Sequence, residues 1–256
     1  MQQRAWLIWE LTRRELGQRY RGTVLGVVWP VLYAVLFLSV FAFVFTYLLN
    51  VRWGTAGGSV TDGALMIFCG MVPYLFIAEV AGRAPTFIIG AQNLVKRVRF
   101  PIEIIPVVNV NAALVLTAVN LSLLVAFAMI ARGLSWPAPI FLTLIAIPLY
   151  MFGLGLGWLL SSLTVFFRDI GQVAPILVQI MMFLAPVFYP SDIIPSDIRP
   201  AFGWNPLTYF VEADRAALNG HFDLVLWARV TASHLAFAIL ARVIFQRLRP
   251  AFGDIL

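Results

Sequence analysis

The sequence has little of the chemistry on which soluble enzymes and secreted domains depend. Only 12% of its 256 residues are charged, which is about half the share found in an ordinary soluble domain. The single cysteine, Cys69, excludes an internal disulfide framework. With two histidines and no cysteine cluster, a structural metal site is not expected.

Lysine is almost absent as well. The one lysine, Lys96, is followed by Arg97, so these residues contain no Gly-x-x-x-x-Gly-Lys-Ser/Thr loop to hold nucleotide phosphates. A membrane enzyme acting on phospholipid would need clustered acids or histidines at a bilayer face, and none is visible. We therefore expect no catalysis and no cofactor in this chain. If ATP drives the protein, a separate polypeptide must bind and hydrolyse the nucleotide.

What the sequence has in excess is apolar surface. Apolar residues make up 61% of the chain, and the mean hydropathy is +0.90. A soluble fold of this size cannot hide that much apolar area, because it still needs a charged surface. The apolar residues form long runs rather than short stretches of alternating polarity, which favours helices over a barrel. The sequence thus predicts an all-α integral membrane protein.

Six runs are long and apolar enough to cross a bilayer. Glu79 is the only carboxylate well inside one of them, and we expect it to pair with Arg83 one turn later. Arg229 and Arg242 interrupt the sixth run near its ends, where their side chains can reach the headgroups. The runs are 22–51, 63–82, 104–131, 133–167, 170–191 and 224–246.

The charges between the spans predict the orientation. With the N-terminus in the cytoplasm and six crossings, 13 of the 18 basic residues lie on the cytoplasmic side, as the positive-inside rule requires. Both chain ends are then cytoplasmic. The net charge of +6 indicates either an anionic partner, such as lipid headgroups or a phosphorylated substrate, or nothing more than this topology.

Two cytoplasmic segments lie outside the spans. Residues 2–20 alternate aromatic and aliphatic side chains with arginines and acids, which predicts an amphipathic helix lying on the inner leaflet. Residues 90–106 are basic and contain two prolines, and Asn93 can cap a short helix there. Such a helix suits docking to a soluble protein, although an ordinary basic loop also fits this segment.

On the outer side, residues 186–220 are rich in proline and acids. After Asn205 and Pro206, the apolar residues are spaced like one face of a helix that is too short and too polar to cross the membrane: Leu207, Phe210, Val211, Ala217 and Leu218. We predict an outer-leaflet helical hairpin between the fifth and sixth spans that acts as a gate. A plain outer loop is the alternative.

The first span carries an aromatic stripe. Trp29 is followed at every fourth residue by a ring on one side of the expected helix: Tyr33, Phe37, Phe41 and Phe45. Such rings can line a smooth path for sugars, or they can serve only packing and lipid contact. In the fourth span, Gly153 and Gly157 form a small-xxx-small pair that predicts close helix packing.

Six short motifs follow one another along the chain. They are the run 13–30 (RRELGQRYRGTVLGVVWP), 93–101 (NLVKRVRFP) with Ile104 and Pro106 after it, 167–170 (FRDI), 186–190 (PVFYP), 205–207 (NPL) and 248–254 (LRPAFGD). Together they resemble the permease subunits of type-2 ABC exporters for polysaccharide, in the branch that exports O-antigen or teichoic acid. Where that family's tail usually has Ala-Asp, this chain has Gly253 before Asp254.

The resemblance implies a half-transporter in the bacterial inner membrane. Two copies would form a twelve-helix channel, and two separate ABC ATP-binding subunits, which hold the ATP and Mg²⁺, would dock below it. The cargo would be an O-antigen-like polysaccharide linked through pyrophosphate to undecaprenol and moved to the external side. The alternative cargoes are teichoic acid, capsule, or a lipid or drug. The alternative class of protein is a membrane enzyme that transfers a phospho-sugar or acyl group. No nucleic acid partner is expected.

The resemblance also implies one transmembrane domain, 1–256, with functional segments. These are the interfacial helix 1–21, the first five spans 22–185, the gate hairpin 186–223, and the sixth span with its tail 224–256. Guanidinium groups suit pyrophosphate, and those at the cytoplasmic mouth are Arg14, Arg19 and Arg21. The aromatic stripe, Trp29 included, would line the glycan channel. The ATPase would contact Asn93, Lys96, Arg97, Arg99, Arg168 and Asp169, and the gate would use Tyr189, Asn205 and Pro206.

Overall fold

A computed structural model describes residues 2–19, 21–49, 51, 53, 59–91, 101–133 and 136–255. Across these residues the structure is helical and has no strand, which confirms the all-α prediction. The long helices are α1 (Gln2–Arg19), α2 (Trp29–Ala42), α3 (Val60–Ile89), α5 (Ile104–Arg132), α6 (Ala138–Phe166), α7 (Ile170–Phe183), α9 (Pro206–Leu218) and α10 (Leu224–Leu248). Two short helices are α8 (Arg199–Gly203) and α11 (Phe252–Ile255).

Four helices of the described chain are long and apolar enough to cross a membrane: α3, α5, α6 and α10 with its continuation to Ala251. The first and fifth predicted spans form shorter apolar helices, Trp29–Phe45 and Ile170–Phe183. The structure thus supports a multi-pass membrane protein, whereas the count of six crossings stays a prediction.

The shortness of α2 and α7 has local causes. Gly22 and Gly26 both have positive φ values, 84° and 50°, so the helix of the first run begins only at Trp29, with Pro30 in its first turn. It ends in a π-helical turn, Phe43–Leu48. The fifth run stops at Phe183, three residues before Pro186, and continues as a turn rather than a helix.

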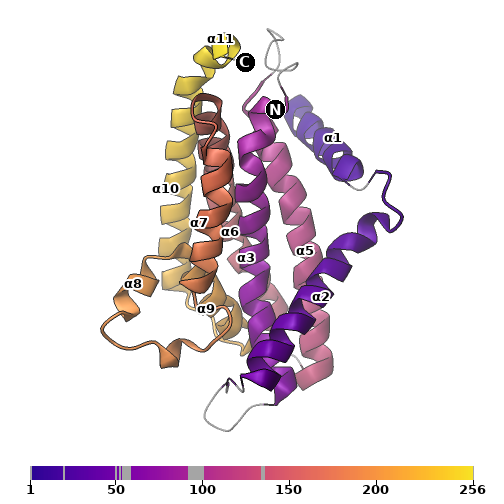
Figure 1. The fold of residues 1–256 in the computed structure, drawn as a ribbon, viewed down its shortest axis with the longest axis vertical. Coiled ribbons are helices and arrows are strands. Elements are labelled where there is room, and N and C mark those ends of the chain that lie inside the picture. Colours follow the sequence, from indigo (N-terminus) through magenta and orange to yellow (C-terminus); the bar gives the residue numbers. More distant parts are fainter. Residues whose placement is uncertain are drawn as a thin grey trace.

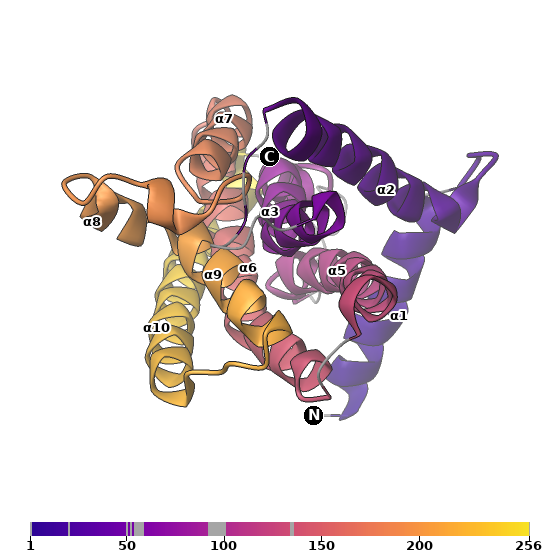
Figure 2. The same ribbon diagram turned by 90° about the horizontal axis from the view of Figure 1, so that it is seen from below.

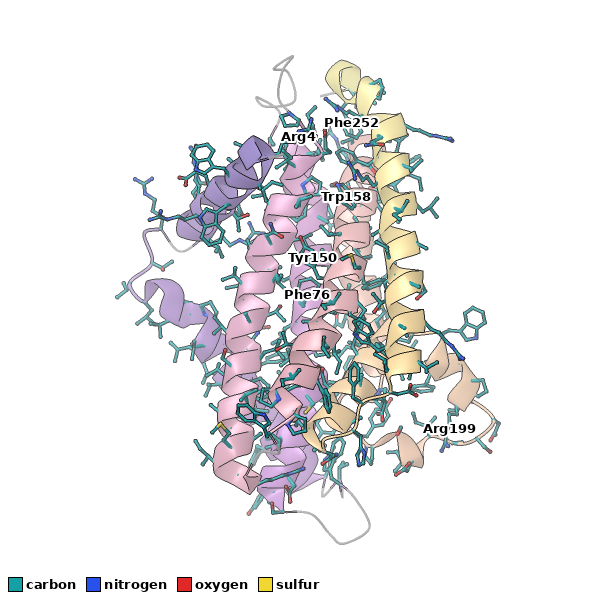
Figure 3. The ribbon with its side chains drawn as sticks, turned by 180° about the vertical axis from the view of Figure 1, so that it is seen from behind. Arg4, Phe76, Tyr150, Trp158, Arg199 and Phe252 are labelled. Atoms are coloured by element: carbon teal, nitrogen blue, oxygen red, sulfur yellow. The ribbon has the colours of Figure 1, made fainter. Side chains whose placement is uncertain are left out.

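Helix α3 runs through the middle of the bundle, with α2, α5, α6 and α7 around it (Figures 1 and 2). α10 packs along α6. The glycines of α6 lie where other helices approach closely: a Cβ added to Gly153 would come within 2.5 Å of the Phe76 ring, and one on Gly157 within 3.0 Å of Val110. This confirms the close packing predicted for the pair. Figure 3 shows Phe76 in the middle of the bundle.

Both ends of the chain lie at the same end of the bundle, together with α1 and α11 (Figure 1). We call this the terminal end, and the opposite end, which carries α8 and α9, the far end. Near the terminal end, Phe252 is fully buried and packs against Phe166 and Phe245. Arg249 also bonds Glu103 at the start of α5, with 3.1 Å between Nη1 and Oε2. The C-terminal segment is therefore fixed to the bundle.

Candidate functional site

The predicted amphipathic helix is present as α1, which packs on α5 at the terminal end. Trp6 and Trp9 are largely exposed, as side chains in a membrane interface would be in a structure without lipid. Arg14 and Arg21 are exposed too, and neither makes an ion pair within the described residues. Two of the three arginines predicted to bind pyrophosphate are thus available for a ligand.

Arg19, the third of these arginines, is held inside the protein. Its side chain is only 5% exposed and bonds Glu79 of α3, with 2.7 Å between Nη1 and Oε1, and Glu15, with 3.2 Å between Nε and Oε1. Arg83 bonds the same two carboxylates at 2.9 Å and 3.5 Å. We call Glu15, Arg19, Glu79 and Arg83 the charged quartet, and it joins α1 to α3.

The predicted pair of Glu79 with Arg83 exists, but it is the longest contact in the quartet. Helical spacing can indicate pairs four residues apart, such as Glu79 with Arg83 or Glu15 with Arg19. It cannot indicate the contact between Arg19 and Glu79, because these residues are 60 positions apart in sequence. The quartet contains two positive and two negative groups, so the charge of Arg19 is already balanced. A role for Arg19 in binding pyrophosphate stays a prediction, and the structure brings its guanidinium next to two carboxylates.

The rings of the aromatic stripe follow one another without a break from Tyr33 to Phe45, but one half of the stripe is packed and the other half is exposed. The rings follow one another at 5.3, 4.7 and 6.1 Å between centroids, from Tyr33 to Phe45. Phe41 and Phe45 also stack on the buried Phe188, at 4.4 and 4.8 Å. Toward the start of α2 the stripe is open, since Trp29 and Tyr33 are 45% and 54% exposed. Packing thus accounts for the far-end half of the stripe but not for Trp29 and Tyr33.

Phe188 belongs to the proline-bounded turn 186–190, which is buried against α3 at the far end. Gly70 of α3 makes this approach possible: a Cβ at Gly70 would lie 3.0 Å from Val187 Cα and 3.1 Å from its carbonyl oxygen. Val187 and Phe188 are buried. Any larger residue at position 70 would press on the backbone of the turn.

Arg215 of α9 fastens the same turn. Its guanidinium donates to the carbonyl oxygens of Val187 at 3.0 Å and Tyr189 at 3.4 Å. It also donates to the carbonyl of Met66 in α3 at 3.3 Å and to Glu212 at 3.1 Å, and it lies 4.6 Å from the centre of the Trp53 ring. We call Arg215 and these partners the Arg215 cluster. One nearly buried cation thus joins the turn, α3 and α9.

The sequence analysis did not single out Arg215, although a signal was present. The face of α9 predicted from Leu207, Phe210, Val211, Ala217 and Leu218 is confirmed as buried. Asp214 and Arg215 fall between these residues and are buried with them. Charged residues on the buried face of a short helix indicate a polar contact in the interior, since unpaired charges there would be costly.

The residues predicted to form the outer gate contact neighbouring segments at the far end. Asn205 Oδ1 accepts a hydrogen bond from the Leu207 amide at 3.0 Å and so caps α9, with Pro206 in its first turn. Asn205 Nδ2 donates to Met181 of α7 at 2.8 Å. The Tyr189 hydroxyl donates to the Phe183 carbonyl at 3.0 Å. These residues tie α7, the turn and α9 together.

The residues predicted to contact an ATPase are only partly described. Arg168 and Asp169 form the exposed turn between α6 and α7, on the terminal side of the bundle. Asn93, Lys96, Arg97 and Arg99 lie outside the described residues. No group of three or more histidine, cysteine or acidic side chains that could hold a metal occurs in the described part of the chain.

Comparisons with known proteins give this helical architecture a family. The model of the ABC-2 type transporter family matches residues 7–219. O-antigen export system permease protein RfbA of Klebsiella pneumoniae is 25% identical over 250 residues, which cover 96% of this chain and 93% of that protein. The protein of the same name from Myxococcus xanthus is 27% identical over 253 residues, covering 97% and 94%. Because the family model spans most of the sequence, this chain belongs to the ABC-2 type transporter family.

Proposed function

We propose that this chain is the channel-forming permease subunit of an ATP-driven exporter. Two copies and two separate ATP-binding subunits would move an undecaprenyl-pyrophosphate-linked, O-antigen-like polysaccharide from the cytoplasmic to the external side of the inner membrane. The relatives named as O-antigen export permeases support this cargo, because they match the chain over nearly its full length. The terminal end would face the cytoplasm, as the positive-inside rule favours.

The observation that best supports a channel between two copies is the apolar face formed by α2 and α7. Both helices lie on one side of α3 (Figures 1 and 2), both are 14 residues long, and both expose large apolar side chains. Neither helix extends as an α-helix over the full length of a membrane span, since α2 continues as the π-helical turn Phe43–Leu48 and α7 ends at Phe183. A second copy related by a two-fold axis would cover the exposed apolar side chains of this face and enclose a path between the copies.

The two ends of the bundle would act as the entrance and the exit of this path. At the terminal end, the exposed Arg14 and Arg21 offer planar guanidinium groups to pyrophosphate. The exposed turn with Arg168 and Asp169 would meet the ATPase. At the far end, the 186–190 turn, which the Arg215 cluster holds against α3, would act as the outer gate.

Depletion of the protein tests the export step directly. We expect finished lipid-linked polysaccharide to accumulate on the cytoplasmic side, where fractionation of the two membrane faces and sugar analysis would identify it. Unchanged glycan in both pools would point to a lipid or drug cargo. Missing or unfinished polymer would point to an enzyme of its synthesis. Either of these two results would contradict the proposal.

Complementing the depleted cells with arginine variants tests the entrance. We expect the double variant with Arg14→Ala and Arg21→Ala to lower export at least about tenfold, because each hydrogen bond between charged partners contributes about 1.5–3 kcal/mol. Arg229→Ala, which removes an exposed arginine of α10, is the matched control and should export normally. Normal export by the double variant would remove both arginines from the site.

A further inference from the structure

A pocket with unused hydrogen-bond acceptors lies between α2, α3 and α5, next to the charged quartet. Its volume is about 340 Å³, which is at the small end for sites that bind small molecules. Its lining residues come from α2, α3 and α5, and no described residue of α7 is among them. The lining residues that matter here are Trp29, Tyr33, Phe76, Glu79, Thr117 and Asn120.

The polar groups of this pocket need hydrogen-bond donors. Asn120 is 8% exposed, and its Oδ1 has no hydrogen-bond partner within the described residues. The Thr117 hydroxyl donates to Ala113 at 3.0 Å, so its oxygen can still accept. In the described structure both arginine contacts of Glu79 go to Oε1, which leaves Oε2 free. An unpartnered amide near the middle of an apolar helix is costly and marks a site of function more often than a packing position.

The charges around the pocket favour a neutral ligand. An anion would meet the Glu79 carboxylate and the oxygens of Thr117 and Asn120, against one amide NH2 group of Asn120 as a donor. A cation at Glu79 would lie close to Arg19, whose Nη1 is 2.7 Å from the same carboxylate. The quartet is balanced as it stands, so a ligand with hydroxyl donors and no charge fits without breaking an ion pair.

Two ring side chains complete the site. Trp29 and Tyr33 line the pocket and are about half exposed, so their faces are available to the C–H surface of a saturated ring. The larger groove between α5 and α6, of about 750 Å³, lacks this combination. Its polar lining residues, Ser122, Thr143 and Tyr150, are hydroxyls that donate within the chain. No carboxylate and no amide side chain is among its described lining residues, and the rest of the lining is apolar, as an acyl chain requires.

We propose that the pocket between α2, α3 and α5 binds the sugar ring of a lipid-borne glycoside, with its hydroxyls donating to Asn120, Thr117 and Glu79 and its face on Trp29 or Tyr33. The sugar could belong to a lipid-linked glycan or to a membrane glycolipid. The identity of the natural sugar rests on the proposed function, whereas the binding does not. A ring held here would lie between α2 and the body of the bundle and would stabilise one position of α2.

Photolabelling of the full chain in nanodiscs tests the site without ATP or polymer. The probe is a dodecyl glucoside with a diazirine in its chain, and the control probe has the same chain with a phosphocholine head. We expect the glucoside to label peptides of α2 and α5 selectively. Asn120→Leu should reduce this labelling about tenfold, since one hydrogen bond to a buried group is lost. Thr117→Val is a second variant that keeps the side-chain shape and should reduce labelling in the same direction.

Asn109→Leu is the matched control, because Asn109 lies on α5 outside the pocket lining and donates to Ile105; it should label like the unchanged protein. Asn120→Leu should also raise the melting temperature, since it removes an unpartnered buried oxygen. Equal labelling by both probes, or full labelling of the Asn120 and Thr117 variants, would overturn the proposal. If lipid-linked glycan competes with the probe and a diacyl glycolipid does not, the natural sugar belongs to a lipid-linked glycan. The reverse pattern would assign it to a membrane glycolipid. The labelling requires no export, so failure of this proposal and failure of the proposed function can be told apart.

Discussion

At the terminal end, two arginines and two carboxylates join α1 to α3, whereas at the far end one arginine joins three segments mainly through backbone carbonyls. The charged quartet is partly open to solvent, with the side chain of Arg83 40% exposed. The side chain of Arg215 is 8% exposed, and Trp53 covers it. Ion pairs between side chains can exchange partners and weaken in salt. Buried hydrogen bonds to a turn cannot exchange without leaving carbonyls unsatisfied.

This contrast has a functional meaning for an exporter. In the proposed exporter, the terminal end would admit a charged lipid headgroup, and the quartet would open there if a phosphate replaced one of its carboxylates. The far end would stay closed until a polymer arrives. We therefore infer that α1 is the more easily moved element and that the 186–190 turn is the more firmly held one. The four predictions below test this difference from the largest expected effect to the smallest.

Removing the cation of the Arg215 cluster should have the largest effect. We expect Arg215→Leu to lower the free energy of unfolding by about 3–5 kcal/mol, because carbonyls buried beneath the turn lose their donor. Arg215→Lys should recover only part of the loss, since one ammonium cannot reach all of these carbonyls in the fixed geometry of a guanidinium. Thermal unfolding in detergent measures both variants. A loss below that of the quartet variant described below would reverse the comparison.

A larger side chain at position 70 tests how firmly the 186–190 turn is packed at the far end. Gly70→Val would place a side chain against the backbone of Val187, and we expect a loss of about 1–3 kcal/mol from overpacking. Gly82→Val is the matched control, because Gly82 lies on the same helix and an added Cβ there meets nothing within 4 Å. Proteolysis of the 186–198 segment should accelerate in the Gly70 variant only. Equal losses in both variants would show that contact with the turn is not the cause, because valine is more favourable than glycine in a helix interior.

Neutralising one member of the charged quartet should lower the stability moderately and should loosen only the terminal end. With Glu79→Gln, Arg19 keeps only Glu15, and we expect a loss of about 1–2 kcal/mol, because the site is partly screened by solvent. Hydrogen exchange should rise in α1 and stay unchanged in α9. Glu10→Gln removes an exposed carboxylate of α1 that has no ion pair within the described residues, and it should change neither. Faster exchange in α9 would show that the two ends are coupled rather than independent.

Much of the architecture was predictable from the sequence, and the long-range contacts were not. Long uncharged runs predicted the helices, and helical spacing predicted the buried face of α9 and the Glu79–Arg83 pair. Arg19 reaches Glu79 across 60 positions, and Arg215 reaches Met66 across 149. Periodicity describes one element at a time, so it cannot show which elements meet. The shortening of α2 by Gly22 and Gly26 was missed because hydropathy does not register backbone conformation.

The cap of α9 should give the smallest effect, and it separates two roles of one side chain. Asn205→Ala removes the acceptor for Leu207 and the donor to Met181, and we expect a loss of about 1 kcal/mol or slightly more. Asn205→Ser keeps a capping oxygen but cannot reach α7. If Ser restores most of the stability, Asn205 acts mainly as a helix cap. If it restores little, the link to α7 dominates, and the far end is held by α7 as well as by Arg215. Thermal unfolding of the two variants side by side distinguishes these outcomes. Both variants lack the bond to α7, and only the serine variant keeps the helix cap.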